Sequence, residues 1–495
     1  MHPVDLIVFA VYMLAVLGVG YYFMRRNDSN EDYYLGGRNM SYPHIGLSVV
    51  ATDVGGGFSI GLGGLGFVMG IAGSWMLFTG LLGAWLAAVF LIPIVKPISE
   101  KEKFYSMPDV FGYFFDARVA VVAGIISAIG YLGFTSSQML AGAVLASSTF
   151  DELSLSTALY VMGAIIIVYT VMGGIKAVIY TDTFQWILLL GGLIFVGIPL
   201  SWVAVGGLEG IREVVEPEML QLTNITWQQA LNWSITIIPI WFVGMTLYQR
   251  IYASRSTADA KKAWYLAGLF EWPIMAFMGV MLGLMARVAA EQGLFLDLGV
   301  SEAGDIHQEQ GLPMLLRTIL PVGLLGLMMS AYFSAIMSTA DSCLVAASGN
   351  VTSDLIAKWF GMDMDNPSLI RMSQIVTLVL GGVALLLAAA METVLDIMLY
   401  SYAVMVSGLL VPIIGGLYWK KGSSTGALWA MIVGGGITLI LTMIPEIASS
   451  LGTDISFEMP FGLDPIIFGI TASAIVFVVL SRLFPDGTQK ITTFN

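Results

Sequence analysis

The chain has 495 residues, of which 57% are hydrophobic and only 11% are charged, and its mean hydropathy is +0.85. Soluble globular proteins of this length do not have such a composition, so the sequence predicts an all-α, polytopic membrane protein. The net charge of −13 argues against nucleic acid as a partner, and one cysteine, Cys343, is too few for an intramolecular disulfide.

Apolar runs of helix length predict about thirteen transmembrane spans. In chain order they are residues 4–24, 45–70, 73–95, 119–147, 157–173, 181–203, 232–254, 263–288, 319–348, 370–390, 394–417, 424–444 and 464–481. Basic residues concentrate in alternate loops, since only Arg212, Arg287 and Arg317 fall on the side opposite the other lysines and arginines. By the positive-inside rule, this asymmetry predicts a multi-pass protein of the cytoplasmic (inner) membrane, with the N-terminus outside and the C-terminus inside. The same count assigns Arg250 to an inner segment.

The second span is interrupted in its middle by the run Ala51-Thr52-Asp53-Val54-Gly55-Gly56-Gly57. A charged side chain at membrane depth costs at least about 2.5–3.5 kcal/mol, and consecutive glycines weaken a helix. Such a break is tolerated where the freed backbone lines a cavity or holds an ion. The run therefore predicts a discontinuous helix at a binding site.

The ninth span places hydroxyl groups at the depth of that break. Ser330, Ser334, Ser338 and Ser342 are spaced four residues apart, with Thr339 beside them. Asp53 and Ser338 each lie about ten residues, or ~15 Å, from the inner end of their span. Backbone carbonyls and hydroxyls at one level are the ligands that sodium prefers, although hydroxyl stripes also serve as hydrogen bonds between membrane helices. The combination with the broken span favours an ion site.

A second acidic cluster is predicted slightly further inward. Asp182 begins the sixth span, and Asp341 and Ser342 lie one turn below Ser338. This cluster predicts either a second cation site or a gate, and the alternative is that Thr181 or Asp182 caps the start of a helix. Glu271 is a third acid at membrane depth, and no partner for it can be named from the sequence.

Several segments resemble the signature of the sodium/solute symporter family, including its sodium/proline and choline-type members. They are residues 173–185 (GGIKAVIYTDTFQ), 334–341 (SAIMSTAD), 34–38 (YLGGR), 249–250, 410–412 and 418–421. The resemblance implies a leucine-transporter (LeuT) type fold of two inverted five-helix repeats with discontinuous helices. The repeats fall at residues 45–203 and 232–417, with one extra helix at 4–24 and two more at 424–481.

The resemblance also implies the ligands. Sodium is expected on the carbonyls of Ala51, Val54 and Ala335 and on the hydroxyls of Ser338 and Thr339. Asp341 departs from the hydroxyl residue that family members with a second sodium site carry at this position, so one sodium ion is expected and the second site stays open. The substrate is expected beside the break, near Asp53, Gly55, Gly56, Gly57, Phe58, Trp75, Phe134, Ser137, Gln138, Trp241 and Tyr402.

The expected function is sodium-coupled import of a small organic solute by alternating access, in a monomeric unit and without an organic cofactor. An amino acid such as proline, or a choline-like amine, leads as the solute. The alternatives are proton coupling, a monocarboxylate or sugar as the solute, and a transporter-like sensor or channel. No nucleophile–base pair or metal cluster is recognisable, so no enzymatic activity is expected.

Overall fold

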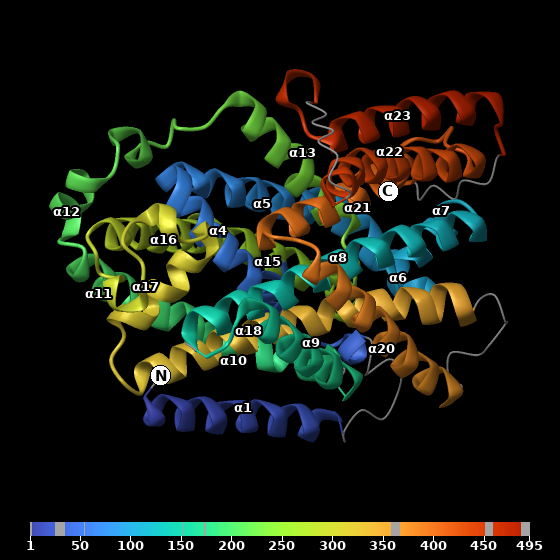
Figure 1. The fold of residues 1–495 in the computed structure, drawn as a ribbon. Helices are drawn as coiled ribbons and strands as arrows, with labels where there is room; N and C mark the ends of the chain where they lie inside the picture. Colours follow the sequence, from blue (N-terminus) through green and yellow to red (C-terminus); the bar gives the residue numbers. More distant parts are fainter. Residues whose placement is uncertain are drawn as a thin grey trace.

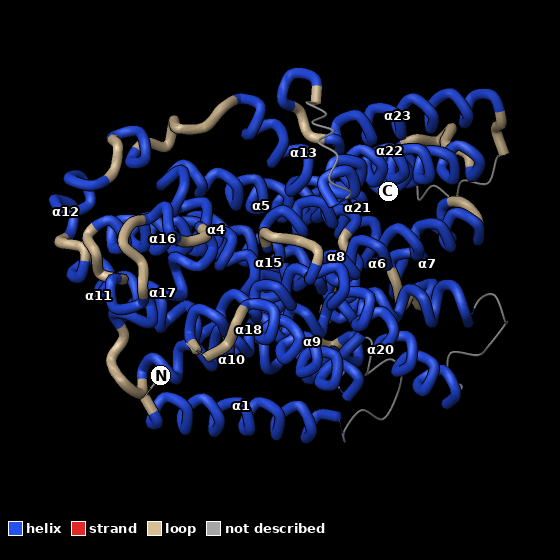
Figure 2. Tube along the Cα trace, viewed as in Figure 1, coloured by secondary structure: helices blue, strands red, loops and turns tan. Residues whose placement is uncertain are grey.

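A computed structural model describes residues 2–24, 35–53, 55–150, 152–172, 175–357, 367–450 and 459–486. These parts of the chain are helical, apart from short connections and an isolated β-bridge between Met40 and Ser254. Figure 2 shows this as a bundle of helices joined by loops. The all-α prediction is confirmed.

The helices follow the predicted spans closely. They are α1 (Pro3–Met24), α3 (Tyr42–Asp53), α4 (Gly55–Met69), α5 (Trp75–Leu86), α6 (Ile92–Glu102), α7 (Met107–Phe114), α8 (Ala117–Thr149), α9 (Leu155–Met172), α10 (Ile175–Gly192), α11 (Ile198–Ala204), α12 (Gly207–Val214), α13 (Trp227–Val243), α14 (Met245–Ala253), α15 (Thr257–Leu269), α16 (Ala276–Glu291), α17 (Gly311–Ile319), α18 (Leu324–Gly349), α20 (Pro367–Ala389), α21 (Val394–Tyr418), α22 (Ser424–Ser450) and α23 (Pro465–Leu483). Within the described residues, eight helices are long and apolar enough to cross a membrane, or nine if the bent pair α13–α14 is one span. The number thirteen therefore stays a prediction.

Helix α18 lies at the centre of the bundle. It packs against α8, α1, α10 and α4, and α8 packs in turn against α21. Every residue of α18 from Met328 to Gly349 is buried, which is typical of a helix surrounded by others. Figure 1 shows α1 along one side of the bundle, with α22 and α23 along the opposite side.

Among the described residues, three helical spans are broken. The first break lies between α3, which ends at Asp53, and α4, which begins at Gly55 with a φ of +53°. The second lies at Gly244, where α13 and α14 meet at an angle of 43°. The third interrupts α15–α16, where Trp272 has extended backbone angles before Pro273. The segments predicted as two repeats, 45–203 and 232–417, thus each begin with a broken helix.

Candidate sodium and substrate site

The first break of the chain lies against α18, as the sequence predicts. The Thr339 hydroxyl is 3.0 Å from the Ala51 carbonyl oxygen at the end of α3, and 3.0 Å from the Ala335 carbonyl oxygen one turn earlier on α18. Three of the five predicted sodium ligands therefore converge. All three are uncharged oxygens, the donors that hard cations such as sodium prefer.

Close contact at this point requires a glycine. A Cβ on Gly55 would lie 2.7 Å from Thr339 Oγ1 and 2.9 Å from Thr339 Cγ2. The positive φ of Gly55 is also a conformation that other residues seldom adopt. Glycine at this position thus permits both the positive φ at the break and the close approach of α4 to α18.

Of the two remaining predicted sodium ligands, Ser338 and Val54, the structure describes Ser338. Ser338 lies next to Thr339, and its hydroxyl donates to Asp182 Oδ1. Val54 lies outside the described residues. For the predicted substrate residues Asp53, Gly56, Gly57 and Phe58, the structure describes the helical backbone alone.

Asp182 is the acceptor for two hydroxyl groups from other helices. Its Oδ2 accepts from Ser48 at 2.7 Å, and its Oδ1 accepts from Ser338. Because α10 begins at Ile175, Asp182 lies within the helix, and the alternative that it caps the helix start is wrong. Asp182 therefore joins α3, α10 and α18.

Arg250 completes this buried cluster from α14. Its Nη2 lies 3.8 Å from Asp182 Oδ2 and donates to Thr52 Oγ1 at 2.6 Å and to Ser342 Oγ at 3.2 Å. Its Nε donates to Ser48 Oγ at 3.3 Å. The guanidinium group has no solvent exposure, so its charge depends on these partners.

The structure buries Arg250 inside the bundle, in a cluster that the sequence analysis did not predict. The available signal was its position in the predicted span 232–254, because an ionisable residue in a span indicates a functional role by default. Asp341, the other acid of the predicted cluster, is completely buried and lies near Thr170 and Asp182.

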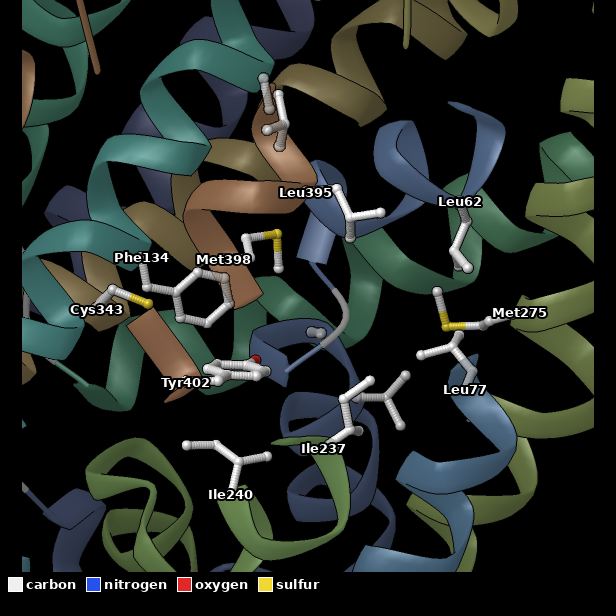
Figure 3. Packing of buried hydrophobic residues seen from close by; sticks show 14 of the residues in the cluster. Leu62, Leu77, Phe134, Ile237, Ile240, Met275, Cys343, Leu395, Met398 and Tyr402 are labelled. Carbon is white, nitrogen blue, oxygen red and sulfur yellow. The ribbon is translucent and has the colours of Figure 1, made fainter. Parts of the chain in front are cut away.

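The predicted substrate residues of α8 gather with Tyr402 of α21. The Phe134 and Tyr402 rings meet edge to face with centroids 5.3 Å apart. The Gln138 amide nitrogen is 3.3 Å from Ser137 Oγ and 3.9 Å from Met398 Sδ. Figure 3 shows Phe134, Met398 and Tyr402 side by side. Met398 was not predicted, because a lone methionine in an apolar helix carries no signal of its own.

Two predicted aromatic residues lie in other surroundings. Trp75 donates its ring N–H to the Leu222 carbonyl at 2.8 Å and stacks on Trp272. Trp241 packs against Trp264 and so close to Gly83 that a Cβ there would be 2.3 Å from its ring. Trp241 thus packs between α5, α13 and α15, whereas Trp75 contacts the connection before α13 and the bend at Trp272.

The sequence is similar to those of known sodium-coupled transporters. A model of the sodium:solute symporter family matches residues 33–434. The chain is 26% identical to a sodium/glucose cotransporter of Vibrio parahaemolyticus, over 98% of this chain and 92% of that protein. It is 28% identical to the sodium/proline symporter of Escherichia coli (strain K12), over 87% of this chain and 86% of the relative. It is also 29% identical to the human sodium/myo-inositol cotransporter 2, over 90% and 71% of the two chains.

A solved structure shares the fold across the full length. The chain superposes on a Na+-coupled sialic acid symporter, in a substrate-bound outward-open state, with a TM-score of 0.76. The alignment covers 98% of this chain and 99% of the symporter at 22% sequence identity. The likeness shows a common helical architecture.

Proposed function

We propose an ion site, a gate and a solute class for this chain, which belongs to the sodium:solute symporter family. As a member of that family, it is a membrane transporter that couples sodium to a small organic solute. The sodium ion is held by the carbonyls of Ala51, Val54 and Ala335 and by the hydroxyls of Ser338 and Thr339. The observation that carries this proposal is the position of Thr339 Oγ1, 3.0 Å from two of those carbonyls.

The cluster around Asp182 acts as a gate in this proposal. The guanidinium of Arg250 lies between Asp182 and Ser342, the residues that a second cation would need. A fixed positive charge there repels a second sodium ion, so the geometry supports one sodium ion and a polar lock between α3, α10, α14 and α18. Opening this lock would separate helices of the two repeats, 45–203 and 232–417.

The proposed solute is an amino acid such as proline, or a choline-like amine. The residues that support it are Phe134 and Tyr402 as an apolar wall and Gln138 and Ser137 as polar groups, and the sequence adds Asp53 as a predicted substrate residue. The proline symporters among the relatives support the same choice. The sugar cotransporters among them make a sugar the second candidate.

Coupling follows from thermodynamic linkage. Sodium draws the end of α3 against α18 and so orders the broken segment for the solute, and by reciprocity the solute strengthens sodium binding. Rocking of one repeat against the other then exposes both to the opposite side. A membrane potential contributes about 2.3 kcal/mol per charge per 100 mV to uphill uptake. In this proposal, the unit is a monomer of the inner membrane with the N-terminus outside.

The test is uptake into liposomes that contain the purified protein. Labelled proline, choline and glucose are each offered with an inward sodium gradient, with an equal potassium gradient and with a pH gradient alone. Accumulation of proline or choline only with sodium is the expected result. Accumulation at the full rate without sodium, or with the pH gradient alone, would overturn sodium coupling.

A further inference from the structure

An apolar groove lies along α21 where this helix packs against α23 (Figure 1). It begins about two turns beyond Tyr402 and is thus separate from the substrate residues. Its volume is about 320 Å³. This is room for about ten groups the size of a water molecule, at about 30 Å³ each, and a methylene group has a similar size. The groove is lined by Leu410, Val411, Ile414, Tyr418, Trp419 and Phe477.

A missing side chain gives the groove its depth. A Cβ on Gly415 would lie 2.2 Å from the ring of Phe477 in α23, so that ring is seated between the two helices. Phe477 is only 2% exposed, whereas Ile414 and Tyr418 are 36% and 46% exposed. Exposed apolar side chains of a membrane bundle face lipid, and an empty recess among them would forfeit packing contacts. Lipid hydrocarbon is therefore the natural filling of this groove.

Two aromatic residues mark one end of the groove. The Trp419 and Phe477 rings meet edge to face with centroids 5.4 Å apart. The Tyr418 hydroxyl donates to the Phe90 carbonyl at 2.6 Å, which fixes its ring against the segment between α5 and α6. Tryptophan and tyrosine are enriched where the hydrocarbon of a membrane meets its headgroups. This end of the groove therefore has the composition of a membrane–water boundary.

Three exposed cations surround the same end. Lys420 and Lys421 directly follow the groove in the chain, and both are exposed. The Ser423 N–H donates to Ser481 Oγ at 3.0 Å, which brings this turn beside the exposed Arg482 at the end of α23. Basic residues next to an apolar groove between helices are typical of a site for an anionic lipid headgroup.

The neighbouring acids do not cancel this charge. Asp486 accepts from the Ser424 N–H at 2.6 Å, and counting it against the three cations leaves two positive charges in excess. Asp116 is paired with Arg118, with Oδ2 and Nη2 2.7 Å apart, so that pair adds no net charge. The chain as a whole carries a net charge of −13, so a local positive excess runs against its composition. The complementary partner is an anion.

We propose that this groove binds one anionic phospholipid, with an acyl chain along α21 and α23 and the phosphate on Lys420, Lys421 and Arg482. A zwitterionic lipid fills the groove equally well but brings no net negative charge to the cations. The bound lipid holds the end of α21 against α23. The inference goes beyond the proposed function, because this site needs neither sodium nor solute.

The test uses Trp419 as a reporter at the groove. The protein is placed in phosphatidylcholine liposomes that contain increasing fractions of phosphatidylglycerol or phosphatidylcholine with brominated acyl chains, since bromine quenches tryptophan fluorescence on contact. The signal of Trp419 is the difference between the unmodified protein and Trp419→Phe. Half-maximal quenching is expected at an about tenfold lower fraction of the brominated phosphatidylglycerol. Equal quenching by the two lipids would overturn the proposal.

Two variants separate the headgroup from the acyl chain. The triple variant Lys420→Gln, Lys421→Gln and Arg482→Gln is expected to remove the preference and to leave quenching by both lipids at the level of the zwitterionic one. Ile414→Phe places a larger side chain in the groove and is expected to reduce quenching by both lipids severalfold. An unchanged preference in the triple variant would overturn the headgroup site.

A charge-matched control excludes a general surface effect. Lys101→Gln, Lys103→Gln and Lys262→Gln together remove three exposed cations at the ends of α6 and α15, and this variant is expected to keep the full preference. An equal loss of preference in this control would assign it to diffuse surface charge and would overturn the site. Trp419 that neither lipid quenches, in a protein that migrates as a dimer, would assign the groove to a second copy of the chain and would also overturn it.

Discussion

Gly55 lies directly against Thr339, with room for a hydrogen atom between them and no room for a methyl group. The same threonine hydroxyl reaches the Ala51 carbonyl on the other side of the break. The break between α3 and α4 is thus pressed onto a single side chain of α18. This relationship makes the site sensitive to a single methyl group on either partner.

Gly55→Ala is expected to abolish sodium-dependent uptake. The added methyl group would lie 2.7 Å from Thr339 Oγ1, and a positive φ adds strain of order 1–3 kcal/mol for a residue other than glycine. The measurements are thermal stability with and without sodium, and uptake. Gly18→Ala in α1 is the matched control, because nothing lies within 4 Å of its added methyl group. Full sodium stabilisation in folded Gly55→Ala would contradict the proposed site.

Thr339→Ala is expected to weaken sodium binding by about tenfold or more, since it removes a ligand and leaves the Ala51 carbonyl without its hydroxyl partner. Thr339→Ser keeps the hydroxyl and is expected to retain most of the affinity. Sodium titrations of thermal stability measure both. Equal sodium affinity in the alanine and serine variants would argue against a role for this hydroxyl.

Asp182→Asn and Arg250→Met are each expected to destabilise the protein, because each leaves a buried charge without its counterpart, at a cost of roughly 3–5 kcal/mol. The double variant is expected to be more stable than the two single losses added together. Unfolding midpoints of the four proteins measure the coupling. Strict additivity would show that Ser48 and Thr52, rather than the ion pair, satisfy these groups.

Asp5→Ala is expected to destabilise α18 by about 1–2 kcal/mol. The buried Asp5 carboxylate of α1 accepts from the Gly323 N–H at 2.6 Å and from the Gly326 N–H at 2.9 Å, and so caps the helix that carries Thr339. Hydrogen exchange of the first turn of α18 is the measurement. Asp5→Asn keeps an acceptor and is expected to lose less, and equal exchange in all three proteins would contradict the cap.

Much of the fold follows from local sequence. Apolar runs are long enough to identify the helices, and Asp53 with three glycines identifies the break, because both signals reside in consecutive residues. The spacing of Ser338 and Thr339 on one helix was likewise sufficient to choose α18 as the partner of the break. The family resemblance predicted Phe134 and Tyr402 as substrate residues, but it did not predict that their rings are in contact.

Long-range pairing was decided by the tertiary structure alone. Nothing in the sequence indicates that Arg250 reaches Asp182 or that Asp5 caps α18, because the partners are separated by 68 to 321 residues. A helix terminus needs an acceptor and a buried charge needs a counter-charge, but the sequence does not state which distant residue supplies it. Local chemistry determines the helices and where they break, whereas their packing selects the partners.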